Sequence, residues 1–524
     1  MTTDAAIVVE PQPFGGSALA QAMYAGTLPP ALDARALTGR AAIVASARAV
    51  QARFVPAQRQ ALREWLERAT ALSAAAPAAA MRLRAALERG LLVTTGQQPG
   101  LFGGPLYTWH KALSAIALAD ALQAELDVPV APLFWAATDD ADFVEGQSTW
   151  LPTANGAVRA SMATVDDATG SRPVSALPLP ALHEALAAFD AACGSAAAPQ
   201  VRDAVHAAYQ PPRTVGDAYV QLLRALLEPH GMAVVDASHV ALRTAAHPIT
   251  TAALREASRV DAALDARDVA LRSAGHTPQV ERVAGQSLVF AWDAAGKSRV
   301  SVAEAAAHAA RAEPGSLSGN VLLRPVIERA LLPTVAYVAG PGELAYFAQL
   351  GAVAETLGLD VPRAVARWSA RIIEPRVRRA LEALAVPERA LADPDHLLHQ
   401  LARAGLPPAL AAALASGRAS LAACVDQVRA SADGLHVPEP VLVGAHRRLQ
   451  HDLDRLERRI VAHASREDAA RRARVHLAAG TLYPGGVPQE RALNALPLLA
   501  RFGDALWEAW RGGAAAWAAA LLDA

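Results

Sequence analysis

Cysteine is nearly absent from this chain of 524 residues, which contains only Cys193 and Cys424. Two thiols so far apart in sequence cannot build a disulfide framework, and they lack the paired spacing of a structural zinc site. The first residues also lack a basic segment followed by an apolar run, so we expect no secretory signal. These absences predict a reduced, cytoplasmic protein without zinc.

Aromatic residues and net charge are also scarce. Aromatic residues make up 5% of the chain, so alanine-rich helices account for much of its 53% hydrophobic content. The net charge is −1, and acids and arginines are interspersed, which argues against the basic surface that nucleic-acid binding requires. No stretch reaches about 18 uncharged apolar residues. We therefore expect a globular protein that binds neither nucleic acid nor membranes.

Lysine is rare as well. Only Lys111 and Lys297 occur, so arginine supplies the rest of the 49 basic residues. A chain that uses arginine almost everywhere keeps lysine at position 111, which suggests a role for a compact ammonium that a planar guanidinium cannot fill. Lys111 ends the glycine-rich stretch VTTGQQPGLFGGPLYTWHK, which begins at Val93.

The first three-quarters of the chain alternates apolar strands with helical periodicity. The predicted strands are Leu91–Thr95, Val128–Ala137, a run ending at Asp236, Thr334–Val338 and one within 362–373. The predicted helices include Val55–Arg89, Leu106–Leu126, Ala218–Leu227 and Glu343–Leu357. Such strand–helix units, interrupted twice, predict an α/β fold with a doubly wound, parallel, five-stranded Rossmann-like sheet.

The chain after Pro375 is predicted to be all helical. Apolar residues at three-to-four spacing there predict a coiled-coil or antiparallel helical arm: Leu442, Leu449, Leu453, Leu456 and Ile460. Such an arm is a candidate dimerisation element, and a plain amphipathic helix on the main domain is the alternative. The predicted divisions are an N-terminal helical segment (1–89), core parts (90–150, 216–244, 316–375), inserted segments (151–215, and 245–315 with an antiparallel strand pair), the arm (376–475), and a C-terminal loop and helix (476–524).

Two loops compete for the ligand site of such a sheet. Ligands bind beyond the carboxyl ends of the strands, where the strand order reverses. If the order is 3-2-1-4-5, the loops Thr95–Pro105 and Gly340–Glu343 face each other, and their N–H groups and helix dipoles would favour a phosphate or carboxylate. The alternative is that the glycines only make tight turns, and neither standard phosphate-loop motif is present. The candidate binding residues here are Thr95, Gly96, Gln97, Gln98, Gly103, Gly104, Gly340, Gly342 and Glu343.

Charged residues near these loops are the candidates for chemistry. His110 and Lys111 are the catalytic candidates, because both fall in the first turns of a helix and could donate to a phosphate or an oxyanion; a structural histidine is the alternative. The acids Asp139, Asp140 and Asp142 could hold an ammonium or Mg²⁺, or merely cap a helix. Asn320 and Arg324 could together bind a carboxylate. The alternative is that Asn320 caps a helix and Arg324 is a surface arginine.

Four blocks in this order carry a resemblance: TGQQPGLFGGPLYTWHK, PLFWAATDDADFVE, LRPVIERALLPTVAYVAGPGELAYFAQL and LYPGGVPQER. They resemble the BshC family, the cysteine-adding enzymes of bacillithiol biosynthesis. The resemblance implies a core like that of class I nucleotidyltransferases and synthetases, with two inserted connecting segments and a coiled-coil arm that forms a homodimer. It also implies a cysteine ligase that joins L-cysteine to the amine of glucosaminyl-malate, with ATP as the implied cosubstrate and Mg²⁺ as a candidate companion.

The chain also departs from the patterns that the resemblance implies. His110 matches the final histidine of the class I histidine signature, beside the phosphates. The family's acidic block usually carries a histidine where this chain has Ala141, so that histidine's role cannot be transferred. The lysine-rich K-M-S-K-S loop of class I enzymes is absent, and Arg367 and Arg371 are candidate substitutes.

These residues together predict a mechanism. The cysteine carboxylate would become an adenylate between the two loops, with His110 and Lys111 stabilising the phosphoryl charge. An acid of the 139–145 cluster would hold an amine, and Arg324 or Arg367 would take a carboxylate or the malate part of the acceptor. Two alternatives stay open: a donor other than ATP, and a non-catalytic dimeric partner that binds the sugar-malate or a nucleotide.

Overall fold

The computed structural model describes residues 7–32, 39–72, 77–163, 172–293, 296–431 and 438–523. The chain forms two compact units. The first comprises Met1–Thr153, Val158–Ile373 and Gln489–Ala524, and the second comprises Ala154–Ala157 and Glu374–Pro488. Parts of several predicted segments lie outside the described residues: 1–6, 33–38 and 73–76 in the N-terminal helical segment, 164–171 in the first inserted segment, 294–295 in the predicted strand pair, 432–437 in the arm, and 524 at the end of the C-terminal segment.

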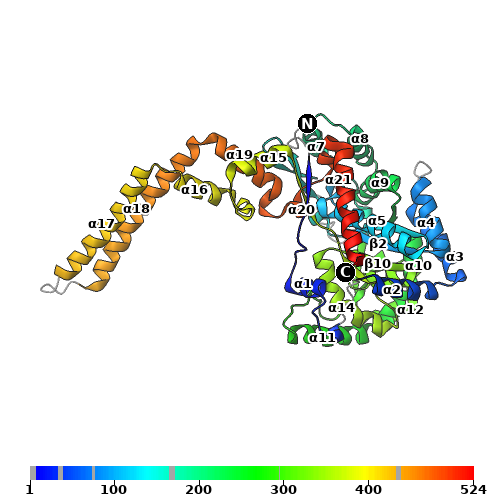
Figure 1. Ribbon diagram of the computed structural model, residues 1–524. Helices are drawn as coiled ribbons and strands as arrows, with labels where there is room; N and C mark the ends of the chain where they lie inside the picture. The colour runs from blue at the N-terminus through cyan, green and yellow to red at the C-terminus, as the bar shows by residue number, and fades with distance from the viewer. Residues whose placement is uncertain are drawn as a thin grey trace. The chain divides into compact units, whose positions relative to one another are not determined.

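A five-stranded parallel sheet is the centre of the first unit (Figure 1). Its order is β11-β10-β2-β3-β6, which is the order 3-2-1-4-5 that was the condition for the two candidate loops to face each other. Because the chain runs outward from β2 to one edge and later from β10 to the other, the order reverses between β2 and β10. The strands are β2 (Leu91–Gln97), β3 (Val130–Ala136), β6 (Ala233–Asp236), β10 (Thr334–Ala339) and β11 (Ala364–Ala366).

Helices cover both faces of this sheet, which explains why its strands are almost continuously apolar. On one face, α3 (Pro56–Thr70) and α4 (Pro77–Arg89) bury Leu62 and Leu83 against Leu133 and Val235. Helix α5 (Leu106–Leu126) packs on β2 and β3, and α21 (Leu496–Asp523) packs on α5. Helix α5 has the predicted bounds, whereas the predicted helix before residue 90 is two helices, with α3 ending at Ala71 in a left-handed conformation.

The remaining elements of the first unit flank this core. Near the N-terminus lie β1 (Val8–Pro11), α1 (Ala18–Ala25) and α2 (Arg40–Arg53). Between β3 and β6 lie α6 (Phe143–Gly146), the paired β4 (Ser148–Thr153) and β5 (Gly156–Ser161), α7 (His183–Cys193), α8 (Pro199–Ala208) and α9 (Val215–Leu227). Helices α13 (Arg324–Leu331) and α14 (Pro341–Leu357) flank β10, and the short α20 (Gln489–Ala492) precedes α21.

The second inserted segment forms a small antiparallel sheet. It contains the predicted pair, β7 (Gln286–Asp293) and β8 (Gly296–Ser301), and a third strand, β9 (Leu317–Gly319), in the order β8-β7-β9. Three helices accompany it: α10 (Val240–Arg255), α11 (Ala257–Ser273) and α12 (Ala305–Arg311).

The fifth predicted strand is divided. Its first part is β11, but β12 (Ala370–Ile373) leaves the sheet and pairs antiparallel with β1. Two backbone N–H groups hold the link between them: Arg367 N donates to the backbone oxygen of Ala339 (2.9 Å), and Trp368 N donates to the side-chain oxygen Ser114 Oγ (2.9 Å). These bonds anchor residues between the two strands to the core, so one apolar run serves two sheets.

The second unit is helical. Its helices are α15 (Pro375–Leu384), α16 (Pro394–Ala404), α17 (Pro408–Ser431), α18 (Glu439–Glu467) and α19 (Ala469–Leu482). Helices α17 and α18 lie side by side in Figure 1. They run antiparallel, because Arg418 pairs with Asp454 and Glu457 while Arg429 pairs with Glu439.

The apolar stripe predicted for the arm lies on α18 and splits between two faces. Leu453 and Ile460 pack with Leu414 of α17. In contrast, Leu449 is 45% exposed and Leu456 is 50% exposed. By length and hydropathy alone, α17 is also the one helix among the described residues that could cross a membrane, which is weak evidence for a span.

Candidate functional site

A pocket of about 510 Å³ lies at the carboxyl ends of β2 and β3, next to the β2–β10 junction where the strand order reverses. The starts of α5, α13 and α14 contribute polar side chains to it, and the β7–β8 hairpin contributes cations. Its polar lining consists of Gln97, Gln98, Lys111, Asp139, Asp140, Lys297, Arg299, Asn320, Arg324, Glu343 and Tyr346. This is the position where ligands bind in doubly wound sheets.

Lys111 lies in the wall of this pocket, and all three of its N–H donors have partners. Its Nζ donates to Gly96 O (2.8 Å) and Gln97 Oε1 (2.8 Å), and it forms an ion pair with Glu343. Burial lowers the pKa of Lys111, and the Glu343 carboxylate opposes that shift. The lysine therefore joins the end of β2 to the start of α14, and it has no free donor for a ligand.

Glu343 is a fully ionised partner in this contact. Burial alone would raise the pKa of Glu343, but Lys111 and the Tyr337 hydroxyl outweigh it and hold that pKa below its ordinary value. Tyr337 Oη donates to Oε1 (2.6 Å), and Gly340 N donates to Oε2 (2.8 Å). The carboxylate thus occupies the N-terminus of α14, where an external anion was predicted to bind. Gly340 and the exposed Gly342 are absent from the pocket lining.

The glycine-rich loop after β2 corrects the prediction of an anion-binding nest. Phe102 N donates to Tyr209 Oη (2.8 Å), Gly103 N to Gly100 O (3.0 Å) and Gly104 N to Leu101 O (3.1 Å). Residues 101–104 are buried, and Gly103 and Gly104 have φ values of 83° and 77°. Gly103 and Gly104 serve the turn itself, because their N–H groups and that of Phe102 already have acceptors inside the protein.

A buried asparagine that sequence reasoning missed holds this loop. Asn494 Nδ2 donates to Phe102 O (3.0 Å) and Gly104 O (3.2 Å). Thr95 is also structural, since its hydroxyl donates to Val338 O (2.8 Å) and ties β2 to β10. Gly96 does reach the pocket, and a Cβ there would lie 2.8 Å from Trp135 O, so only glycine fits.

His110 lies outside the pocket, contrary to its predicted role. Its ring is fully buried between Trp368 and Trp510, at centroid distances of 5.4 Å and 5.8 Å. Burial lowers the pKa of His110, and the carboxylate of Glu490, whose Oε2 lies 3.6 Å from Nδ1, opposes that shift. The histidine packs α5 against α21 and the β11–β12 link.

Arg367 is held in the same buried cluster. Both of its terminal nitrogens donate to the Glu490 carboxylate at 2.9 Å, and the arginine does not line the pocket. The other candidate substitute for a lysine-rich loop, Arg371, pairs with Glu10 of β1 at 2.5 Å. Neither guanidinium is available to a ligand, because each already has a carboxylate partner.

The acidic block contributes two of its three candidates to the pocket. Asp140 accepts hydrogen bonds from Gln98 Nε2 and from Asp142 N (3.2 Å). Asp142 is absent from the lining and caps α6, accepting from Glu145 N (3.2 Å). Asp139 differs from both, because its carboxylate accepts no side-chain or backbone hydrogen bond from another described residue. Burial raises the pKa of Asp139, and Lys297 opposes that shift.

Asn320 and Arg324 both line the pocket at the start of α13. Arg324 Nη2 donates to Tyr346 Oη (3.3 Å), and its buried Nη1 has no partner among the described residues. A carboxyl group lies beneath the pocket as well: Glu328 is fully buried, and Thr94 donates to it. Burial raises the pKa of Glu328 to about 7.

Comparison with known proteins agrees with this architecture. Residues 41–368 match the N-terminal Rossmann-like domain of the bacillithiol biosynthesis protein BshC, and residues 370–511 match its C-terminal coiled-coil domain. The chain belongs to the BshC family. Among the described residues of this BshC chain, no group of three or more His, Cys, Asp or Glu side chains is placed to hold a metal ion.

Curated relatives extend over most of this BshC chain. A protein of Koribacter versatilis is 32% identical over 438 residues, which cover 80% of this chain and 81% of the relative. A protein of Solibacter usitatus is 32% identical over 436 residues, covering 78% and 80%. A protein of Salinibacter ruber is 29% identical over 444 residues, covering 79% of each. All three carry the name "Putative cysteine ligase BshC", the name of a ligase.

Several pocket residues of this BshC chain were missed by sequence reasoning. Lys297, Arg299 and Phe290 come from the β7–β8 hairpin, about 150 residues beyond the acidic block that they face. The scarcity of lysine pointed to Lys297 as much as to Lys111, but nothing in the local sequence indicates that this hairpin reaches the pocket. Ala141, at the position of the family's histidine, also lines it.

Proposed function

We propose that this chain forms an amide bond between the carboxyl group of L-cysteine and the sugar amine of glucosaminyl-malate, the last step of bacillithiol biosynthesis. Family membership and the names of the relatives support this reaction. The setting would be the cytoplasm, with which the free thiols of Cys193 and Cys424 agree. The reaction would occur in the pocket beside the β2–β10 junction.

The observation that carries the proposal is the Asp139 carboxyl group. It faces the pocket, accepts no hydrogen bond from another described residue, and has a raised pKa because it is recessed from water. A carboxylate in this state suits an amine, which it can first hold as an ammonium and then deprotonate. Asp139 would be the general base of amide formation.

The proposed step uses an acyl-adenylate of cysteine. The sugar nitrogen attacks the carbonyl carbon and the new C–N bond forms, while the bond from that carbon to the phosphate oxygen of AMP breaks. AMP leaves with the electron pair, and Asp139 takes the proton that the amine loses. In the pocket, Arg324 is the candidate to bind the negatively charged phosphate of AMP, because its Nη1 has no partner among the described residues.

A second candidate function is the same amide formation with a cysteine donor that is already activated. The glycine-rich loop after β2 favours this second candidate, because the N–H groups of Phe102, Gly103 and Gly104 all have internal acceptors and are not free to bind phosphate. The groups predicted to meet the phosphates are also engaged, with Lys111 bound to Glu343 and Arg367 bound to Glu490. Phosphate binding would then depend on Arg324 and the cations of the β7–β8 hairpin.

Homodimerisation through the helical arm is part of the proposal. Leu449 and Leu456 are seven residues apart on α18 and are about half exposed, whereas Leu453 and Ile460 pack with α17 residues. A row of leucines at heptad spacing on an antiparallel helix pair suits a second copy of the same surface.

The test is an incubation of the purified protein with cysteine, glucosaminyl-malate and ATP, with and without Mg²⁺. Mass spectrometry would follow the amide product, and chromatography would follow AMP. Equal amounts of AMP and product support adenylate formation. Product formed only from a preactivated cysteine, such as its thioester, supports the second candidate. Absence of product with either donor would reject both and leave a binding role in the pathway.

A further inference from the structure

Arg299 is a cation of the pocket wall without a carboxylate partner. It belongs to β8, is half-buried, and lies over the ring of Phe290 with its guanidinium carbon 4.9 Å from the centroid. Among the described residues, no acid forms an ion pair with it. A recessed guanidinium with free N–H groups is the group that proteins use most readily to bind carboxylates.

Asn320 presents a second free donor to the same space. Its carbonyl oxygen accepts from Leu322 N and Leu323 N, both at 3.1 Å, which fixes the orientation of the amide. The NH₂ group is therefore on the other side, and it makes no hydrogen bond within the part of the chain that the structure describes. Asn320 is only 9% exposed, so this donor pair is a recessed feature of the pocket.

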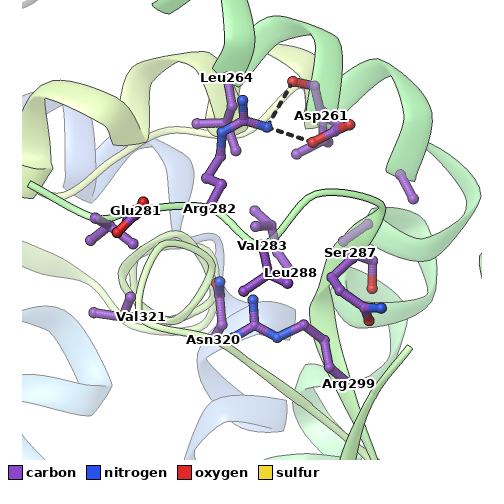
Figure 2. A pocket seen from close by; sticks show the side chains of 15 residues that line it. Asp261, Leu264, Glu281, Arg282, Val283, Ser287, Leu288, Arg299, Asn320 and Val321 are labelled. Atoms are coloured by element: carbon purple, nitrogen blue, oxygen red, sulfur yellow. Dashed lines mark hydrogen bonds and ion pairs between the residues drawn. The ribbon is translucent and has the colours of Figure 1, made fainter. Parts of the chain in front are cut away.

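Arg299 and Asn320 line both the main pocket and a second, small pocket, drawn in Figure 2 and called the annex below. The annex has a volume of about 50 Å³, which gives room for a small group such as a carboxylate. Figure 2 shows the Arg299 side chain extending toward Asn320, while Arg282 turns to Asp261. Arg282 is neutralised by ion pairs with Asp261, Asp265 and Asp268, so it does not compete for a ligand.

Lys297 fixes the hairpin that carries Arg299. Its Nζ donates to Asp139 O (2.5 Å) and lies 4.6 Å from the Phe290 centroid. The strand end that bears the free carboxylate and the hairpin that bears the free guanidinium are therefore in direct contact. One ligand can thus meet a carboxylate and a guanidinium in one pocket.

We propose that Arg299 and the Asn320 amide form a carboxylate subsite, which binds the malate end of the acceptor while Asp139 holds its ammonium. This inference rests on the proposed function. It states which part of the substrate the pocket recognises. The main pocket holds four cations and three acids, of which Lys111 and Glu343 neutralise each other, and the annex adds the Arg282–Asp261 pair and the exposed Glu281. That balance suits a ligand with two carboxylates and one ammonium better than a polyphosphate placed beside Asp139 and Asp140.

The experiment is calorimetric titration with glucosaminyl-malate and with its dimethyl ester, which keeps the ammonium and removes both carboxylate charges. The variants are Arg299→Gln and Asn320→Asp, the second of which keeps an oxygen that can accept from Leu322 N and Leu323 N in the turn before α13. The matched control is Arg311→Gln, which removes an exposed cation of the same inserted segment. Thermal unfolding of each variant would verify that it is folded.

The wild type is expected to prefer the diacid, and Arg299→Gln to weaken diacid binding about tenfold to hundredfold with little change for the diester. Asn320→Asp should act in the same direction, and Arg311→Gln should match the wild type. Diacid binding unchanged in Arg299→Gln, or diacid and diester weakened equally, would overturn the subsite. A wild type that binds the diacid and the diester equally well would also overturn it.

Failure of the proposed function would look different. In that case the wild type would yield no amide product with any cysteine donor, although its preference for the diacid and the effect of Arg299→Gln could both persist. Product formation by the wild type with an unaltered KM for glucosaminyl-malate in Arg299→Gln would reject the subsite alone.

Discussion

His110 and Lys111 are consecutive residues with opposite surroundings. Successive side chains on an α-helix point in directions about 100° apart, so neighbours rarely share a face. On α5, Lys111 reaches the pocket wall, whereas His110 lies between Trp368 and Trp510. The motif therefore combines one residue of the site with one residue of the core.

The position of His110 leads to a prediction about stability. His110→Ala should lower the free energy of unfolding by about 2–4 kcal/mol, because it opens a cavity beside two tryptophans. Turnover per folded molecule should remain close to that of the wild type. Urea unfolding and a turnover assay at matched folded fraction would measure both effects, with His183→Ala on the exposed start of α7 as the control. A stable but inactive variant would restore the catalytic interpretation of the sequence.

Asp139 is the residue whose substitution we predict to reduce turnover without affecting folding. Asp139→Asn should reduce turnover at least about hundredfold with little change in stability, because the amide cannot accept the proton of the amine. In the wild type kcat/KM should rise with pH as Asp139 loses its proton, over a range above its ordinary pKa, because burial raises that pKa. Asp142→Asn, which keeps the cap of α6, is the control. Equal turnover in both variants would exclude Asp139 as the base.

Glu328 should make stability depend on pH. Its pKa is about 7 in the folded protein, compared with 4.5 for an ordinary glutamate, so between these values the native state binds the proton more tightly than the unfolded chain. Stability should therefore fall as pH rises from 4.5 to 7, by at most about 3 kcal/mol from this group. Chemical denaturation at pH 5 and pH 8 should show a smaller fall for Glu328→Gln. The same pH dependence in both proteins would disprove the assignment.

At the scale of elements, the Lys111–Glu343 pair joins three of them. It connects the end of β2 with the starts of α5 and α14, beside the reversal of strand order. An ammonium makes three N–H contacts in a small space, which a planar guanidinium cannot reproduce. This explains why a chain with almost no lysine has one here.

We predict that Lys111→Met lowers the free energy of unfolding by about 3–5 kcal/mol, because it leaves Glu343 charged and buried. The double variant with Glu343→Gln should recover part of that loss, since no uncompensated charge remains. Guanidinium unfolding of the wild type, both single variants and the double variant would give the coupling between them. Additive effects would show that the pair is not energetically linked.

At the scale of the whole molecule, the exposed leucines of α18 predict the oligomeric state. Leu449→Glu combined with Leu456→Glu should convert a dimer to a monomer in analytical ultracentrifugation, because two carboxylates would then be buried in an apolar contact. Thermal stability of the separated monomer should change little, since both positions are half-exposed. Val269→Glu, at an exposed site on α11, is the control. A dimeric double variant, or a monomeric wild type, would reject the arm as the dimer contact.

Much of the fold could be predicted from the sequence because it depends on local patterns. Apolar runs of strand length, the uninterrupted period of α5 and the glycines after β2 are properties of neighbouring residues, and they led to the parallel sheet, whereas its strand order was only assumed. The position of the pocket followed, because the carboxyl ends of adjacent parallel strands share one edge.

Only the tertiary structure decided which groups are free to act. Sequence cannot show that Asn494 and Tyr209 satisfy the glycine-rich loop, or that Glu490 engages Arg367, because these partners lie more than 100 residues away. Nor does the sequence place the β7–β8 hairpin beside Asp139. Local pattern determines an element, but a donor or acceptor is available to a ligand only if no distant residue has already paired with it.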